Sequence, residues 1–285
     1  MGVIKIRTFK KHSVFINSTG RTGTQFLAKV MSKMIDDCSS FHEPGTPWIS
    51  KPDKWLTQIK QFGLYHMTLG QLKDSHSMFK LSAERIRGNL NDEQIKKYII
   101  HMREEFIKQI ESEIYVESSG HIYGLLDILD DLFENSKFVF IIRDPRNWIR
   151  SALNTYEYIL YGPLDLKFAN LSIKASDLPK DNYYNYWEQM SLFEKYCWYY
   201  NKLNSYVIGK MEGKSNFKIF RYEDLFSEET RDQNFKNMLD FAADFPDGFQ
   251  RKINYRPELM ARKLHSNSED KKIAHWKDWE SSKVE

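Results

Sequence analysis

The sequence predicts an α/β fold in which helices cover both faces of a central parallel β-sheet. Short apolar runs, which are typical of buried strands, alternate with segments of helical periodicity. The runs lie at residues 14–16, 79–81, 114–116, 138–142 and 217–220. With 285 residues, of which 41% are apolar, the chain is long enough to bury a full core. We expect a single domain over residues 1–285.

Composition and charge exclude several classes of protein. A net charge of +3 gives no support to a general nucleic-acid or membrane function, although it leaves room for a local anion site. Cys38 and Cys197 are too few for a disulfide framework or a zinc site. The sequence has no apolar window of membrane-spanning length and no signal-peptide core. We expect a cytoplasmic protein with no membrane or nucleic-acid partner, and its oligomeric state stays open.

The first strand leads into a loop that is rich in glycine and hydroxyl side chains. Residues 16–27 read INSTGRTGTQFL. Apolar residues then recur at the spacing of a helix face, at Phe26, Leu27, Val30, Met31 and Met34. In a strand–loop–helix unit, backbone N–H groups and the positive end of the helix dipole point into the loop. The pattern therefore predicts a phosphate or sulfate site.

This loop differs from the loop that binds nucleoside triphosphates. In G-x-x-x-x-G-K-[ST], the lysine reaches the terminal phosphates and the hydroxyl holds magnesium. Here Thr24 and Gln25 follow Gly23, so the lysine is missing, and Arg21 is the only cation of the loop. A glycine-rich turn without a ligand is the alternative at this point.

Three segments further along the chain have distinct patterns. Residues 91–113 predict an amphipathic helix that begins at Asn91 or Asp92. Residues 161–182 have weak periodicity and several turn formers, which predicts a long loop or a short helix and a candidate lid. Residues 183–206, rich in tyrosine and tryptophan, predict an aromatic helix that packs into the core.

The most strand-like run, residues 138–142, continues at once into RDPRNWIRSALNTY. Asp144 is a favourable N-cap and Pro145 a favourable first helical residue. Arg143 is thereby placed at the carboxyl end of a central strand, where open α/β sheets bind ligands. An arginine that only caps the sheet edge is the alternative.

Together the two segments resemble the sulfotransferases that use 3′-phosphoadenosine 5′-phosphosulfate (PAPS). In that family a loop after the first strand grips the 5′-phosphosulfate, and its counterpart here is Arg21, Thr22, Gly23, Thr24 and Gln25. A later strand–helix unit supplies an arginine and, eight residues on, a serine for the 3′-phosphate, which Arg143 and Ser151 match. The stretch FKIFRYEDLF is similar to a third motif of the family. The resemblance implies a P-loop NTPase-like sulfotransferase fold.

The family ends in a C-terminal loop that closes over the nucleotide with basic residues and often a glycine and a tryptophan. Its counterpart is DKKIAHWKDW, which lacks the glycine and contains Lys271, Lys272, His275 and Trp276. A solvated basic tail is the alternative.

An acceptor hydroxyl or amine loses its proton as it attacks sulfur, and a histidine or carboxylate is the usual base. The segment CSSFHEPGTPWIS contains Glu43, our first candidate, and His42, the second. A pair that only ties down the turn is the alternative. Near Glu117, which is followed by Ser118 and His121, the resemblance implies the acceptor pocket. Glu117 either orients the acceptor or satisfies buried loop amides.

The resemblance implies transfer of a sulfuryl group from PAPS to a hydroxyl or amine of a small-molecule acceptor, for example a natural product, with PAP as the second product. No metal is expected, since a sulfuryl group in transfer carries less negative charge than a phosphoryl group. Two rival functions remain. One is a P-loop small-molecule kinase with a degenerate phosphate loop, and the other is a non-catalytic nucleotide-binding protein.

Overall fold

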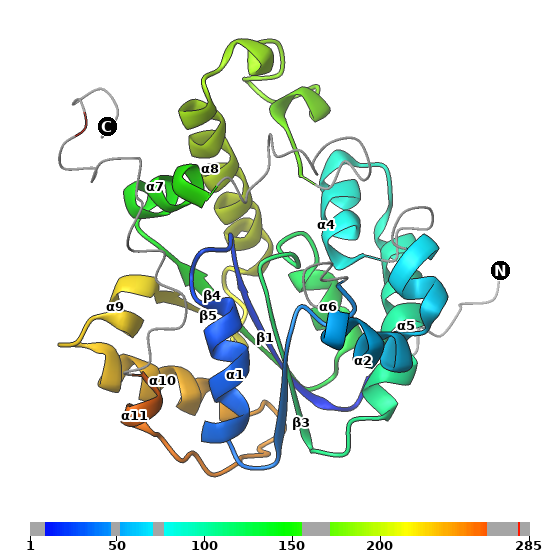
Figure 1. Cartoon of the computed structure of the whole chain (residues 1–285), viewed down its shortest axis with the longest axis vertical. Coiled ribbons are helices and arrows are strands. Elements are labelled where there is room, and N and C mark those ends of the chain that lie inside the picture. Colours follow the sequence, from blue (N-terminus) through cyan, green and yellow to red (C-terminus); the bar gives the residue numbers. More distant parts are fainter. Residues whose placement is uncertain (1–8, 47–51, 71–76, 156–171, 261–278, 280–285) are drawn as a thin grey trace.

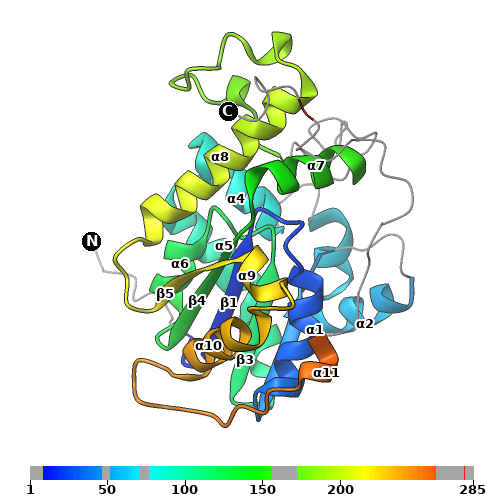
Figure 2. The ribbon, with the colours of Figure 1, turned by 90° about the vertical axis from the view of Figure 1, so that its left-hand side faces the viewer.

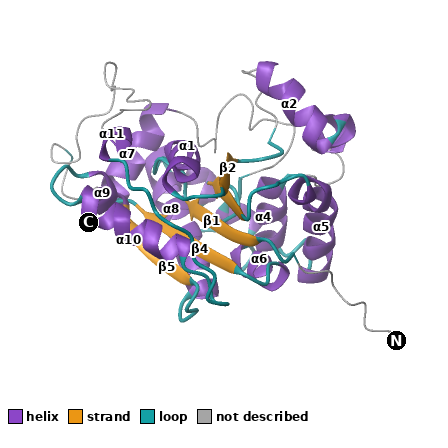
Figure 3. Cartoon of the chain, turned by 90° about the horizontal axis from the view of Figure 1, so that it is seen from below, coloured by secondary structure: helices purple, strands orange, loops and turns teal. Residues whose placement is uncertain are grey.

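The structure, a computed structural model, describes residues 9–46, 52–70, 77–155, 172–260 and 279. Within them, five strands form one sheet in the order β2–β3–β1–β4–β5, and all neighbouring pairs are parallel. The strands are β1 (His12–Ser18), β2 (Cys38–His42), β3 (Ile114–Ser119), β4 (Ser136–Ile142) and β5 (Phe217–Arg221). Figure 3 shows the strands in one layer with helices on both sides, which confirms the predicted fold class.

Two groups of helices cover the sheet (Figure 1). One face packs against α1 (Thr24–Met34) and α10 (Arg231–Ala243). The other face packs against α4 (Met78–Arg87), α5 (Asp92–Lys108), α6 (Leu126–Leu132), α7 (Pro145–Thr155) and α8 (Leu192–Met211). The shorter or peripheral elements are α2 (Pro52–Phe62), η1 (His66–Gly70), η2 (Ala175–Asp177), η3 (Trp187–Gln189), α9 (Tyr222–Phe226) and α11 (Pro257–Met260).

Strand β1 contributes to the cores on both faces. Successive side chains of a strand point to opposite sides. Val14 and Ile16 accordingly lie in the core beneath α1 and α10, while Phe15 lies in the core beneath the other helices. All three are buried. A strand that is apolar on both faces reads as a continuous apolar run, which is why residues 14–16 could be recognised in the sequence.

The order of the strands determines where a ligand site can form. β2 and β3 lie on one side of β1, and β4 and β5 lie on the other. The order of the strands therefore reverses between β1 and β4, since earlier strands are added on one side of β1 and later strands on the other. Open α/β sheets bind ligands at the carboxyl ends of the strands at such a point. The loop after β1 and Arg143 after β4 meet at this edge. In Figure 2 the loop after β1 lies directly below α7.

Two helices begin where the sequence predicts, although α5 ends at Lys108 and not at residue 113. Helix α5 begins after Asn91, whose side chain accepts from the Gln94 N–H at 2.9 Å, while the Gln94 side chain accepts from the Asn91 N–H. In α7, Pro145 is the first helical residue, and the Asp144 side chain accepts from the Arg146 N–H at 2.9 Å.

Three element predictions were wrong in part or in full. Residues 79–81 are not a strand but part of α4, whose first turn is capped by Ser77. Strand β2 was not predicted, because an edge strand of sequence CSSFH lacks the apolar run of a buried strand. The helix expected at residues 183–206 begins only at Leu192, where Ser191 forms a capping box with Glu194. Residues before it form turns and η3.

The candidate lid is described only from residue 172, where the segment forms a bend and then η2. Residues 161–171 lie outside the described residues, and a lid stays a prediction. None of the helices in the described ranges is long and apolar enough to cross a membrane.

Candidate active site

The loop between β1 and α1 is a tight turn that forms hydrogen bonds with Ser18, the last residue of β1. Gly20 (φ 82°), Arg21 (φ 54°) and Gly23 (φ 80°) have left-handed backbone conformations. The buried Ser18 hydroxyl accepts from the Gly20 N–H at 2.9 Å and from the Thr22 hydroxyl at 2.6 Å. In turns with left-handed residues, successive backbone N–H groups can point toward one place and form a concavity that suits an anion.

Gly23 opens the N-terminus of α1 to a ligand. It is the N-cap residue, and no side chain caps this end of the helix. The first N–H groups of a helix have no intrahelical partner, and the helix dipole makes them attract anions. A Cβ atom at Gly23 would lie 3.1 Å from the Phe226 ring, on a backbone that already has a positive φ. Glycine is therefore required both by the conformation and by the packing of α9.

Three of the predicted cofactor-binding residues converge beside this loop. Arg21 donates from Nε to the Ser151 hydroxyl at 3.1 Å. Arg143 donates from Nη1 to the Arg21 carbonyl oxygen at 2.7 Å. The two sequence motifs therefore form one site. Trp148 ties α7 to the same loop, because its Nε1 donates to the Gly20 carbonyl oxygen at 3.0 Å.

The third motif, Tyr222 to Leu225, contacts Arg143 and the residue that follows it. The Tyr222 ring lies 4.5 Å from the Arg143 guanidinium carbon. The Glu223 carboxylate accepts from the Asp144 N–H at 3.0 Å. Burial and the neighbouring Arg21 charge lower the pKa of Arg143, while Tyr222, Glu223 and Asp144 oppose this shift. Sequence reasoning located the motif but missed its role, which depends on β4 and β5 being neighbours.

The residues around the loop fit an anionic nucleotide. Two guanidinium groups, hydroxyl groups and the first-turn amides of α1 are all hydrogen-bond donors. The Arg143 Nε and the Thr19 hydroxyl are buried without a hydrogen-bond partner, so two polar atoms here have bonding capacity to give a ligand. Within the described ranges, no group of histidine, cysteine, aspartate and glutamate has the arrangement of a metal site.

Glu43, the first candidate base, lies between two imidazole rings. Its Oε2 is 3.8 Å from His42 Nε2, and its Oε1 is 3.5 Å from His121 Nδ1. The Gly120 N–H donates to Oε1 at 3.3 Å. Glu43 is 7% exposed and has a φ of 47°, which is a strained conformation for a residue other than glycine. The structure thus brings together three predicted residues that the sequence placed in two separate segments.

Gly120 lies between the Glu43 carboxylate and the loop that joins β1 and α1. A Cβ atom at Gly120 would lie 3.4 Å from the Gly20 Cα and 3.9 Å from Glu43 Oε1. The carboxylate and the loop between β1 and α1 are therefore neighbours across a close backbone contact.

The other predicted acceptor residues are engaged in the protein interior. Glu117 is 1% exposed, and its carboxylate accepts from Arg103 Nη2 at 3.1 Å and from the Tyr115 hydroxyl. The Ser118 hydroxyl donates to the Thr24 carbonyl oxygen at 2.9 Å. These contacts favour a structural role for both residues, and their assignment to an acceptor pocket stays a prediction. Lys271, Lys272, His275 and Trp276 lie outside the described residues.

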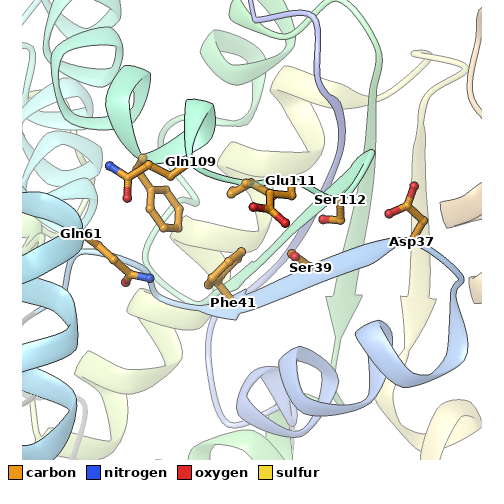
Figure 4. Close-up of a pocket in the computed structure, with 9 residues that line it drawn as sticks. Asp37, Ser39, Phe41, Gln61, Gln109, Glu111 and Ser112 are labelled. Carbon is orange, nitrogen blue, oxygen red and sulfur yellow. The ribbon is translucent and has the colours of Figure 1, made fainter.

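A cavity of about 540 Å³ lies elsewhere, along β2 and the C-terminal end of α5 (Figure 4). Its lining includes Asp37, Ser39, Phe41 and Gln109, and it contains no residue of the loop between β1 and α1. Its lining comes from β2 and the residue before it, from the C-terminal end of α5 and the segment between α5 and β3, and from Gln61 of α2. The loop between β1 and α1 and Arg143 lie instead at the carboxyl ends of β1 and β4. The donors, rather than this cavity, define the candidate active site.

Comparison with known proteins gives a family and several structural similarities. The model of the Sulfotransferase family matches residues 13–241. No curated protein matches the chain. A solved sulfotransferase domain from the curacin biosynthetic pathway is 16% identical over 89% of this chain and 77% of its own, with a TM-score of 0.46.

Two further solved structures are similar. The sulfotransferase domain of the Synechococcus PCC 7002 olefin synthase is 19% identical over 82% of this chain and 74% of its own, with a TM-score of 0.39. A sulfotransferase from Alicyclobacillus acidocaldarius is 14% identical over 88% of this chain and 89% of its own, with a TM-score of 0.42. The family match covers all three sequence motifs. The chain belongs to the sulfotransferase family.

Proposed function

We propose that this sulfotransferase takes its sulfuryl group from PAPS and transfers it to a hydroxyl or amine of a small-molecule acceptor, such as a natural product. The observation that carries the proposal is the convergence of Arg21, Arg143 and Ser151 at the N-terminus of α1. A nucleotide with phosphate groups at both its 5′ and 3′ positions needs two anion sites, and these residues supply donors for both.

The donors divide into two sets. Arg21 and the amides of Thr22 to Gln25 would hold the 5′-phosphosulfate, because they surround the concavity of the loop and the first turn of α1. Arg143 and Ser151 would hold the 3′-phosphate. The hydrogen bond between Arg21 and Ser151 links the two sets. When the nucleotide binds, each of the two residues would replace this bond with a hydrogen bond to a phosphate oxygen.

Bound PAPS would supply the sulfuryl group and the phosphate that leaves it. Arg21 and the loop amides stabilise the negative charge that develops on the departing phosphate. Glu43 is the first candidate for the group that accepts the proton of the acceptor, and His42 is the second. Their closeness to the loop, through Gly120 and Gly20, supports this assignment.

The test is a screen of phenols, sugars, amines and hydroxylated natural products with PAPS, read by mass spectrometry for the gain of one sulfuryl group and by the release of PAP. Parallel reactions with ATP and magnesium serve as the control for the kinase alternative. We expect a sulfated product with PAPS, also in excess chelator. A phosphorylated product, or a dependence on magnesium, would favour the kinase. Binding of PAP without any transfer would favour the non-catalytic alternative.

A further inference from the structure

We propose that the outer side of β2 is a docking edge for an extended segment of a partner protein. The segment adds to the sheet in antiparallel orientation, with apolar side chains over Phe41 and Phe106 and a basic side chain beside Glu111. This inference goes beyond the proposed function and does not rest on it, because it uses neither the nucleotide-binding donors nor the candidate bases.

The backbone of β2 has hydrogen-bonding groups to give to another strand. β2 is the first strand in the order of the sheet, and β3 is its neighbour on the inner side. The Asp37 carbonyl oxygen accepts from the Ile114 N–H at 3.1 Å, so Asp37 faces β3. Alternate residues of a parallel strand face the same neighbour. The N–H and C=O groups of Cys38 and Ser40 therefore point to the outer side, where they have no hydrogen-bond partner among the described residues.

The same side of the chain already pairs with an antiparallel segment just before β2. The Asp36 N–H donates to the Lys252 carbonyl oxygen at 3.1 Å, and Ile35 forms an antiparallel bridge with Ile253. Arg251, one residue earlier, bonds instead to the end of α10. The described chain thus covers the edge before β2 but not beside β2 itself. An antiparallel partner segment would continue this pairing along the strand.

A groove lies over the face of β2 that an added strand would extend. The cavity of about 540 Å³ follows Asp37, Ser39 and Phe41, which lie in a row along β2 in Figure 4. A second cavity of about 340 Å³ shares Gln61 and Phe106 with the first and continues between α2, η1 and α5. Every second side chain of an extended segment points to the same face. An added strand would therefore direct alternate side chains over this groove.

The charge of the groove selects a basic side chain at one end. The described lining of the larger cavity contains the carboxylates of Asp37 and Glu111 and no lysine, arginine or histidine. Asp37 already pairs with Arg251 at 3.3 Å, and the nearby Lys11 ammonium donates to two carbonyl oxygens. Glu111 is exposed and has no ion-pair partner among the described residues. Complementary charge at this position is supplied by a lysine or arginine of the partner.

The other end of the groove is apolar. The Phe41 and Phe106 rings lie 5.0 Å apart, and beyond them Leu64 and Tyr65 are 62% and 50% exposed. Exposed apolar groups beside a groove are typical of an interaction site. Because β2 runs from the carboxylate end toward the apolar end, an antiparallel segment has its apolar residues first and its basic residue last.

The test is the binding of a fluorescein-labelled peptide, measured by fluorescence polarisation. The peptide has seven residues, with isoleucine, leucine and lysine at its second, fourth and sixth positions and threonine elsewhere. Its odd positions pair with Cys38 and Ser40, so N-methylation of the third and fifth residues removes hydrogen bonds to β2. Two lost bonds should weaken binding about 5- to 100-fold. The matched control is N-methylation of the second and fourth residues, whose N–H groups face away from β2, and it should weaken binding much less.

On the protein, Ser40→Pro removes the outward N–H of β2 and leaves the pairing with β3 in place, because proline is tolerated where an edge strand faces outward. It should weaken the peptide about as much as N-methylation does. The matched control is Ile219→Pro in β5, the other edge strand. Its backbone also points outward, since the neighbouring parity faces β4 through the Asn216 carbonyl oxygen. Ile219→Pro should bind the peptide like the wild type, and circular dichroism checks that both variants fold.

A charge exchange tests the basic position without altering the strand. Replacing the lysine of the peptide by glutamate should weaken binding to the wild type, and Glu111→Lys should reverse this preference. Glu111→Gln should weaken the lysine peptide about 2- to 5-fold, the usual effect of an exposed ion pair. Equal affinities of the wild type for the lysine and glutamate peptides would contradict the role of Glu111.

Three results would overturn the docking edge. One is the absence of saturable binding of the lysine peptide to the wild type at millimolar concentration. Another is equal weakening by the two N-methylation patterns, which would place the peptide elsewhere than on the backbone of β2. The third is a wild-type dimer in sedimentation velocity that Ser40→Pro dissociates, since the edge would then be occupied by a second copy of this chain. None of these results bears on sulfuryl transfer from PAPS.

Discussion

Glu43 concentrates several unusual features in one residue: a buried carboxylate, a left-handed backbone and two imidazole neighbours. We predict that Glu43→Gln lowers the rate of sulfuryl transfer about 100- to 10,000-fold, because the first candidate for the proton-accepting group is lost. His42→Gln should reduce the rate much less. Both variants should bind PAP like the wild type, since neither residue belongs to the nucleotide side. Steady-state kinetics and calorimetry on the same preparations check this, and the opposite ranking would make His42 the base.

Glu117 is a second buried carboxylate, and its contacts with Arg103 and Tyr115 favour a role in stability. Removing one member of a buried ion pair leaves the other charge uncompensated, so Glu117→Gln should lower the free energy of unfolding by about 3–5 kcal/mol. The matched control is Glu105→Gln. Its carboxylate pairs with Lys108 on the surface and is 75% exposed, so the loss should stay below about 1 kcal/mol.

Urea unfolding measures both changes. An unchanged unfolding free energy in Glu117→Gln, together with a large loss of turnover, would place Glu117 in the acceptor pocket and contradict its structural role.

Individual site residues differed in how far the sequence revealed them. Arg143 directly follows an apolar run and Arg21 lies in the loop after another, so local pattern drew attention to them, whereas Ser151 was selected through the family resemblance. The contacts of Glu117 with Arg103 and of His121 with Phe79 join residues on different elements. Such contacts depend on the register of β3 and on the packing of α4 and α5, which no local pattern contains.

At the scale of elements, β5 and α9 place an aromatic ring against an arginine that follows β4. We predict that Tyr222→Leu weakens PAP binding about 2- to 30-fold, because it removes a cation–π contact that orients Arg143 without touching the nucleotide. The control is Phe249→Leu, which removes a similar contact with Arg251 outside the site. Calorimetric titration with PAP measures both variants. Wild-type affinity in Tyr222→Leu would show that Arg143 does not need this ring.

The elements themselves were predictable where burial produces a pattern. Strand β4 is buried along almost its whole length and was evident as an apolar run. Edge strand β2 is half-buried and polar, so its pairing with β3, and not its sequence, determines its conformation. In α4 the apolar residues at 79 and 81 gave too short a run to show helical spacing. The cap at Ser77 and the buried Ser82 and Arg85 complete the pattern only once the helix is known.

At the scale of the whole molecule, the strand order creates the site. Because β1 and β4 are neighbours, the loop after β1 meets the helix that follows β4, although more than a hundred residues separate them. Alternating strands and helices predicted a parallel sheet, but several strand orders satisfy that alternation. The resemblance to a family, and not the periodicity, implied that the two motifs form one site.

A 3′-phosphate site formed by Arg143 and Ser151 distinguishes a PAPS enzyme from other nucleotide-binding proteins, and calorimetry with PAP and with AMP, which lacks that phosphate, tests it most directly. Wild-type protein should bind PAP clearly more tightly than AMP. Loss of a charge-assisted contact costs about 1.5–3 kcal/mol, so Arg143→Ala should weaken PAP roughly 10- to 100-fold and leave AMP nearly unchanged. Equal affinities of the wild type for PAP and AMP, or equal weakening of both by Arg143→Ala, would contradict the proposed nucleotide site.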